Sequence, residues 1–164
     1  MIFRLSQKLS TKFKSKTLAS LPLDDNLLAD WSAHLFVADR TQYILLCHTK
    51  SLYSTVTYAR GITDANRFIQ RAMTSLREFM EEDRLAFIYD QFIAPASATV
   101  RFAKALDRSV TGSINDLVNH ARFWLTEGSL SPFDTGFKLN EIPFSSLRYV
   151  KSREAFKRLA DKTG

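Results

Sequence analysis

Apolar and polar residues in the first third of the chain follow patterns that are typical of β-strands. Residues 31–37 and 42–48 are two short, largely apolar runs separated by the polar sequence Asp39-Arg40-Thr41, which predicts a β-hairpin. Residues 52–58 are rich in β-branched and aromatic side chains, so we expect a third strand that extends the hairpin into a meander. Residues 2–5 predict one more short strand.

The periodicity changes to that of a helix after Gly61. Apolar side chains recur three or four positions apart over residues 64–82, which predicts a long amphipathic helix with one face on the core. Thr63 is the expected N-cap of this helix. We expect a second helical segment between Asp83 and Pro95.

The second half of the chain contains one more predicted strand and one more long helix. Residues 99–105 alternate between apolar and polar side chains, which predicts a strand. Residues 114–126 carry an apolar stripe at helical spacing, and Ser113 with Asp116 resembles a capping box at the start of that helix. The pattern after Ser129 is less regular, apart from a predicted basic helix after Ser152 that contains Phe156 and Leu159.

A strand-rich first half followed by long helices indicates the α+β class. We expect an antiparallel or mixed sheet of four to five strands, with the helices at residues 64–82 and 114–126 packed on it. The 164 residues, 45% hydrophobic and 24% charged, are typical of one globular domain, and no repeat or linker divides them. Residues 1–164 are therefore expected to form a single domain.

The net charge of +6 is concentrated at the two ends of the chain. Residues 1–16 contain five basic and no acidic residues, and residues 148–164 contain six basic and two acidic residues. Residues 17–147 contain twelve basic and fifteen acidic residues. Basic ends attract nucleic acid, an acidic protein partner or an anionic membrane surface. Lysines that only keep terminal segments soluble explain the same pattern.

The sequence favours a cytoplasmic protein without a membrane span or a cofactor. No apolar run reaches the length of about 18 residues that a membrane helix needs. The first 23 residues are basic, rich in Ser and Thr and free of acidic residues, which leaves an organelle transit peptide as an alternative. Cys47 is the only cysteine, so there is no intramolecular disulfide, and its apolar surroundings favour a buried thiol over a catalytic one.

A group of cations precedes the helix predicted at residues 114–126. Arg101, Lys104 and Arg108 come just before Ser113, and cations beside exposed helix N–H groups predict a pocket for phosphate or carboxylate. Arg40 is a further candidate for this anion site. The segment lacks a P-loop and a dinucleotide-binding motif, and a solvated strand edge before a capped helix explains it equally well.

Five other polar residues are candidates for acid–base chemistry. His34 and His48 lie in the two arms of the predicted hairpin and form a pair if both face the same side of the sheet. Asp116 and His120 are one helical turn apart, with Asn115 beside them, which resembles half of an acid–base site. Helix capping by Asp116 is the stronger explanation. The three histidines have no spacing typical of a metal site, so no metal is expected.

Several short motifs make the chain resemble a known family. They are Ala29-Asp30-Trp31-Ser32-Ala33-His34-Leu35-Phe36, Asp39-Arg40, Lys104, Arg108-Ser109-Val110, Gly112-Ser113 and Asn115-Asp116-Leu117. The sequence resembles a family of bacterial proteins that carries a domain of unknown function, over nearly its whole length. The resemblance implies a bacterial protein, in some members linked to a plasmid or mobile element, and argues against a transit peptide. It implies no established activity, cofactor or catalytic residue.

Two functions remain open at this point. The first is a non-enzymatic binding module that engages nucleic acid or a partner protein, which fits the charge distribution. The second is a small metal-independent enzyme acting on a phosphate-containing substrate, such as a nuclease or a toxin-like transferase. It would use one of the histidines, with Arg40 and Arg108 stabilising charge.

Overall fold

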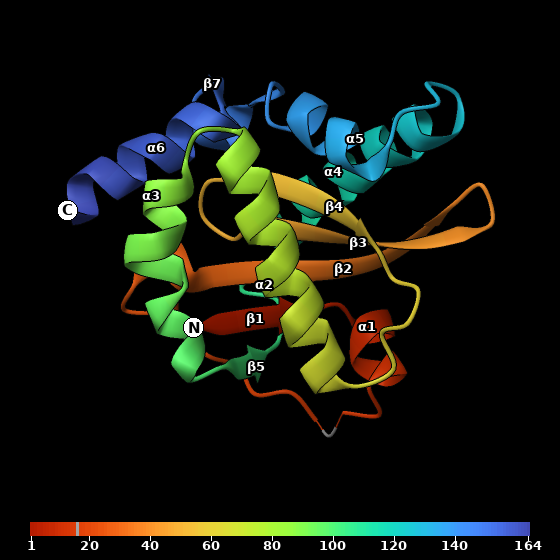
Figure 1. Cartoon of the computed structure of the whole chain (residues 1–164), viewed down its shortest axis with the longest axis horizontal. Helices are drawn as coiled ribbons and strands as arrows, with labels where there is room; N and C mark the ends of the chain where they lie inside the picture. The colour runs from red at the N-terminus through yellow and green to blue at the C-terminus, as the bar shows by residue number, and fades with distance from the viewer. Residues whose placement is uncertain (16) are drawn as a thin grey trace.

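The computed structural model describes residues 1–15 and 17–164, so Lys16, one of the five cations counted in residues 1–16, lies outside the described residues. Five strands form one mixed sheet in the order β4-β3-β2-β1-β5 (Figure 1). The strands are β1 (Ile2–Leu5), β2 (Asp30–Ala38), β3 (Thr41–His48), β4 (Ser54–Tyr58) and β5 (Arg101–Ala103). Strands β2, β3 and β4 form the predicted antiparallel meander, whereas β1 is parallel to both of its neighbours.

The hairpin between β2 and β3 turns at two residues with left-handed backbone angles. Asp39 has φ 44° and Arg40 has φ 61°. Two positive φ values at the centre of a two-residue turn match the right-handed twist of the strands on either side. The hairpin predicted from the polar sequence at this point is therefore confirmed.

Helices cover both faces of the sheet. Helix α2 (Ala65–Glu82) crosses what we call the front face, and α4 (Arg108–Thr126) lies behind the sheet on what we call the back face (Figure 1). Helix α5 (Pro132–Leu139) covers the edge of β4, where Asn140 bonds through its side-chain amide to both the N–H and the C=O of Ser54. The α+β class with a mixed sheet is confirmed.

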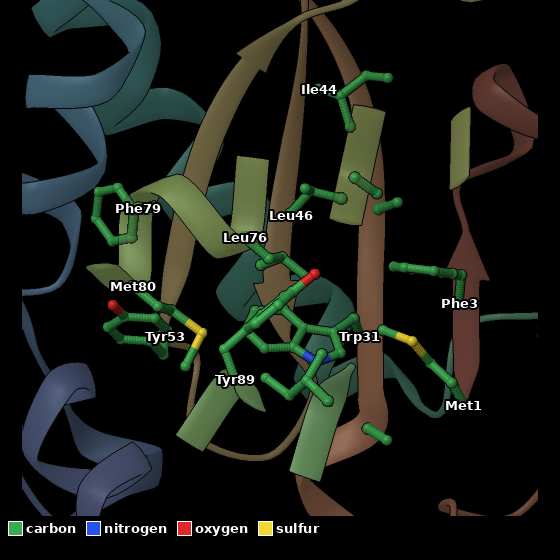
Figure 2. Close-up of a cluster of buried hydrophobic side chains, with 14 of the residues drawn as sticks. Met1, Phe3, Trp31, Ile44, Leu46, Tyr53, Leu76, Phe79, Met80 and Tyr89 are labelled. Carbon is green, nitrogen blue, oxygen red and sulfur yellow. The ribbon is translucent and has the colours of Figure 1, made fainter. Parts of the chain in front are cut away.

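Alternate strand residues build two separate cores, because successive side chains of a strand point to opposite faces. On the front face, Trp31 and Leu46 pack with Leu76, Phe79 and other residues around α2 (Figure 2). The back core consists of Phe36, Leu45, Cys47, Val56 and neighbouring strand residues with Ile114, Leu117, Val118 and Ala121 of α4.

The two long helices begin at caps that differ from the predicted ones. The Asp64 side chain, not Thr63, accepts a hydrogen bond from the N–H of Arg67 at the start of α2. The Asp107 side chain accepts one from the N–H of Val110, so α4 begins at Arg108. The predicted capping box was therefore wrong, because an extended Asp107 offers its carboxylate to the first turn six residues earlier.

The remaining elements connect the layers or complete the C-terminal part. They are α1 (Gln7–Lys12), η1 (Leu27–Ala29), α3 (Ala86–Ile88), η2 (Tyr89–Ile93), η3 (Pro95–Ala98), β6 (Pro143–Phe144), η4 (Ser145–Leu147), β7 (Val150–Lys151) and α6 (Ser152–Thr163). The basic helix predicted after Ser152 is confirmed as α6, whereas α5 makes the rest of the segment after Ser129 more regular than its pattern indicates. Among the described residues, no helix has the length and apolar character that crossing a membrane requires.

Candidate functional site

The predicted anion site at the start of a helix is not formed as expected. Ser113 lies inside α4 rather than at its start, so its N–H is not one of the exposed ones. Arg108 is the first helical residue, and the carboxylate of Asp107 already occupies the helix terminus. A carboxylate at that position opposes a second anion, so the helix terminus is not the binding site.

Arg40 lies far from the other predicted cations. It is at the tip of the hairpin, and Val37 near that tip accepts a hydrogen bond of 3.0 Å from Nε of Arg122. Arg122 and Arg108 are fourteen residues apart on α4, which corresponds to about 20 Å along the helix. Arg40 and Arg108 therefore do not share a site.

The two cations near β5 differ in their surroundings. Arg101 is exposed, and a guanidinium nitrogen lies 3.8 Å from Oδ2 of Asp24. Lys104 is also exposed and lies just after β5, where it borders a cavity on the back face. Of the predicted anion-binding residues, only Lys104 lines this cavity.

His34 and His48 do not form a pair. His34 is opposite Leu45 in the ladder and points to the back face, whereas His48 contacts Trp31 and Phe156 of the front core. His48 is fully buried, with Nδ1 2.8 Å from Oγ of Ser51 and Nε2 2.7 Å from the carbonyl oxygen of Leu27. Burial lowers its pKa to about 4. The hypothesis of an acid–base pair was wrong because the two residues have opposite strand parity.

Asp116 and His120 lie on the exposed side of α4, as does Asn115. Within the described part of the chain, Asp116 and His120 form no hydrogen bond with each other. The ring of His120 stacks on Trp124, with ring centroids 5.6 Å apart. Asp116 is therefore neither the helix cap nor the orienting partner of a catalytic histidine.

A candidate site is a cavity of about 630 Å³ at the end of β1, between α1 and the first turns of α4. Helix α1 follows directly on β1 (Figure 1), and residues from the end of the strand and from the helix line the cavity. The cavity has a volume typical of small-molecule sites. Seven hydroxyl side chains line it, namely Ser6, Ser10, Thr11, Ser15, Thr17, Ser32 and Thr111. None of the described residues that line it is acidic.

Arg4 lies in the floor of this cavity but has no donor left for a ligand. Nε and one terminal nitrogen donate to the two carboxylate oxygens of Asp30, both at 2.8 Å. The terminal nitrogens also donate to the carbonyl oxygens of Leu21, Pro22 and Lys104. These five bonds equal the five N–H groups of a guanidinium. Arg4 is therefore a structural residue whose charge Asp30 balances.

Other polar groups around the cavity remain free to bind a ligand. The side chains of Gln7, Ser10, Thr17, His34 and Lys104 form no hydrogen bond within residues 1–15 and 17–164. Amide, hydroxyl, imidazole and ammonium groups together offer both donors and acceptors. The cavity is thus equipped to bind a polar ligand without breaking existing bonds.

The electrostatic environment of His34 indicates a positive potential at the cavity. Its pKa lies below the ordinary value because the ring is partly buried and because Lys8 and Arg122 are close. Lys8 lies on α1 and Arg122 on α4, and Lys104 adds a third cation from the end of β5. Lys104 therefore lines a cavity without acidic residues among its described lining, and Lys8 and Arg122 add positive charge near His34 without lining the cavity.

The hydroxyl wall was not predicted from the sequence as a site. The one indication of it in the sequence was the composition of the first 23 residues, which are rich in Ser and Thr and contain no acidic residue. Composition alone does not show that Ser6, Ser10 and Thr17 face Ser32 and Thr111. The crossover from β1 through α1 to β2 brings the serines and Thr17 together, and α4 adds Thr111 from behind the sheet.

A family model described as a domain of unknown function (DUF6933) matches residues 2–155. No curated protein and no solved structure matches the chain. The match agrees with the resemblance seen in the sequence motifs. It assigns no activity and no site residue, so functional inference depends on the geometry described above.

Proposed function

Because the chain belongs to the DUF6933 family of domains of unknown function, we propose its function from the geometry of its own residues. The proposed function is that of a non-enzymatic binding module, with nucleic acid as its partner. The sugar–phosphate chain would bind in the cavity at the end of β1. A bacterial, cytoplasmic setting with a link to a plasmid or other mobile element is part of this proposal.

The observation that carries the proposal is the combination of hydroxyl lining, absent carboxylates and surrounding cations. Seven hydroxyl groups and no acidic side chain line the described part of the cavity. Phosphate and ribose oxygens are recognised in proteins by Lys and Arg together with Ser, Thr, Asn and Gln side chains. Lys104 and the free amide of Gln7 line the cavity, and Lys8 and Arg122 are close enough to His34 to lower its pKa.

Binding is favoured over catalysis by the state of His34, the histidine that lines the cavity, and of Cys47, the single cysteine of the sequence. A general base requires a partner that orients it, and His34 has no hydrogen bond within the described residues. Cys47 is fully buried, and burial raises the pKa of its thiol to about 12, which excludes a reactive thiolate near neutral pH. The metal-independent enzyme on a phosphate-containing substrate therefore stays the second candidate.

The test is a fluorescence anisotropy titration of labelled single-stranded RNA, single-stranded DNA and duplex DNA at about 50 and 200 mM salt. We expect affinity to fall steeply with salt for the natural protein. In the Lys8→Gln/Lys104→Gln variant, the slope of log K against log salt should decrease by about 1.4 to 1.8, because two phosphate contacts are lost. Both lysines are exposed, so the fold should be unchanged.

The matched control is Lys157→Gln/Lys162→Gln, which removes the same charge from α6. This control should keep the slope of the natural protein. Equal losses in both variants would show that the cavity is not the binding site. Absence of binding at low salt would overturn the nucleic-acid proposal, and shortening of the labelled strand on a gel would favour the enzyme instead.

A further inference from the structure

A second concave surface lies on the other flank of α4, between this helix and the β6–β7 segment. We call it the aromatic groove, and its volume is about 590 Å³. Phe123 and Asp116 of α4 line one side, and Phe144 and Tyr149 line the other. Its α4 residues differ from Thr111 and Ile114, which line the first cavity. The two sites are therefore separate.

Two aromatic rings in this groove are unusually exposed. Tyr149 is 75% exposed and Phe123 is 58% exposed, the two largest values among the exposed large hydrophobic residues of the described chain. Scattered exposed hydrophobic residues need no explanation, but two in one groove indicate an interaction surface.

The backbone holds Tyr149 in this exposed position at an energetic cost. Arg148 has φ 53° and Tyr149 has φ 60°, two consecutive residues in the left-handed region that non-glycine residues disfavour. Hydrogen bonds from the N–H of Arg148 to Ser145 and from the N–H of Tyr149 to Phe144 stabilise the turn. Such strain is common at functional sites.

The charge of the groove selects the kind of ligand. Asp116 is the only carboxylate among the described lining residues, and no Lys or Arg lines the groove. The Asp116 carboxylate is exposed and has no hydrogen bond or ion pair within the described chain. Aromatic faces beside a free carboxylate attract a cation and repel a phosphate chain. Arg148 precedes Tyr149 in the turn but is not a lining residue.

The same region already contains one cation on an aromatic ring. The ammonium of Lys138 lies 5.6 Å from the ring centroid of Trp124, and Trp124 stacks on His120, which lines the groove. Lys138 and Trp124 do not line the groove, so this contact between a cation and an aromatic ring lies next to the groove.

We propose that the aromatic groove binds the guanidinium group of an arginine side chain in a basic segment of a partner protein. The planar guanidinium stacks on Tyr149 or Phe123 and donates two hydrogen bonds to the Asp116 carboxylate. This site is independent of the nucleic-acid cavity, so either proposal can fail without the other.

The test is an NMR titration of the ¹⁵N-labelled full chain with a Gly/Ser peptide containing one arginine. The comparison peptide contains citrulline, which has nearly the same shape without the charge. We expect the arginine peptide to shift the amide signals of Asp116, Phe123 and Tyr149. The citrulline peptide should bind at least about tenfold more weakly, because it loses the ion pair and the cation–π contact.

Two exposed substitutions test the residues directly. Asp116→Asn and Tyr149→Asn should each weaken arginine-peptide binding about three- to tenfold, and asparagine tolerates the left-handed backbone at position 149. The control is Phe87→Ser, which removes another exposed ring, on α3, and should leave binding unchanged. Unchanged melting temperatures show that the variants fold.

Three results would overturn the proposal. One is equal affinity for the arginine and citrulline peptides. Another is full binding by both groove variants. The third is that a single-stranded oligonucleotide, rather than the arginine peptide, shifts the groove signals, which would assign this surface to nucleic acid.

Discussion

At the scale of single residues, strand parity decides what each histidine does. His34 and His48 belong to adjacent strands, yet one faces a polar cavity and the other the front core. The two histidines have different environments because successive side chains of a strand point to opposite faces of the sheet. Residue type alone therefore did not distinguish a structural histidine from a candidate ligand-binding one.

Buried His48 makes stability depend on pH. Its pKa of about 4 in the folded state lies below the ordinary value of 6.5. Between these two pH values the unfolded chain binds a proton at His48 and the folded chain does not. Stability from this residue is fully present above about pH 6.5 and is lost as pH falls toward 4. We expect the free energy of unfolding to decrease by about 2 kcal/mol between about pH 7.5 and 5, measured by urea denaturation.

The controls for this prediction are His48→Gln and His34→Gln. The first should be less stable near neutral pH but should lose most of the pH dependence, because glutamine does not titrate. The second should retain most of it, since His34 is only partly buried. Equal pH dependence in the natural protein and in His48→Gln would contradict the role of His48.

At the scale of elements, a helix start is decided by which side chain reaches the first turn. Ser113 and Asp116 had the spacing of a capping box, but the Asp107 carboxylate bonds to Val110 and starts α4 earlier. Gly112, which lies before the predicted start at residue 114, is inside the helix. The local spacing of apolar residues predicted a helix here, and the Asp107 cap, six residues before Ser113, determined where the helix begins.

Two glycines in helices allow the steric cost of an added methyl group to be compared with the gain in helix propensity. A methyl group on Gly112 of α4 would have no neighbour within 4 Å, whereas one on Gly136 of α5 would lie 2.8 Å from Cε2 of Phe79 and 3.3 Å from Cα of Thr55. We expect Gly112→Ala to raise the free energy of unfolding by about 0.5 to 1 kcal/mol. Gly136→Ala should lower it by about 1 to 3 kcal/mol, because α5 must move away from β4.

Thermal and urea unfolding of the two variants measure this difference. Each substitution gains the same helix propensity, so the pair isolates the effect of the contact. Stabilisation by both alanines would mean that α5 does not pack closely on the sheet edge.

At the scale of the whole molecule, Arg4 joins segments that are distant in the sequence. Its five hydrogen bonds connect β1 to Asp30 of β2, to the loop at Leu21 and Pro22, and to Lys104 after β5. The pair with Asp30 is almost completely buried. The floor of the candidate cavity is therefore held in place by one side chain.

Removal of Arg4 should destabilise the whole fold. We expect Arg4→Met to lower the free energy of unfolding by about 3 to 5 kcal/mol, because it leaves the Asp30 carboxylate buried without its counterion. Adding Asp30→Asn to that variant should cost less than the sum of the two single changes, as a double-mutant cycle in urea would show. Additive effects would contradict coupling between the two residues.

The sequence by itself determined the α+β class, the meander, the long helix α2 and the presence of a helix around residues 114–126. These features depend on local periodicity and turn residues, which any short segment carries within itself. The polar hairpin turn and the apolar stripe of α2 are examples, since neither needs a distant partner to be recognised.

Only the tertiary structure decided which polar side chains share a site. The parallel pairing of β1 with β2 and β5 places the α1 hydroxyls beside Lys104 and Thr111. The register of β2 and β3 places His34 and His48 on opposite faces, and the length of α4 separates Arg40 from Arg108. The packing of the β6–β7 segment beside α4 places Tyr149 and Phe123 on one groove. These relations depend on strand order, on parity and on contacts between segments up to about a hundred residues apart, none of which is encoded in a local pattern.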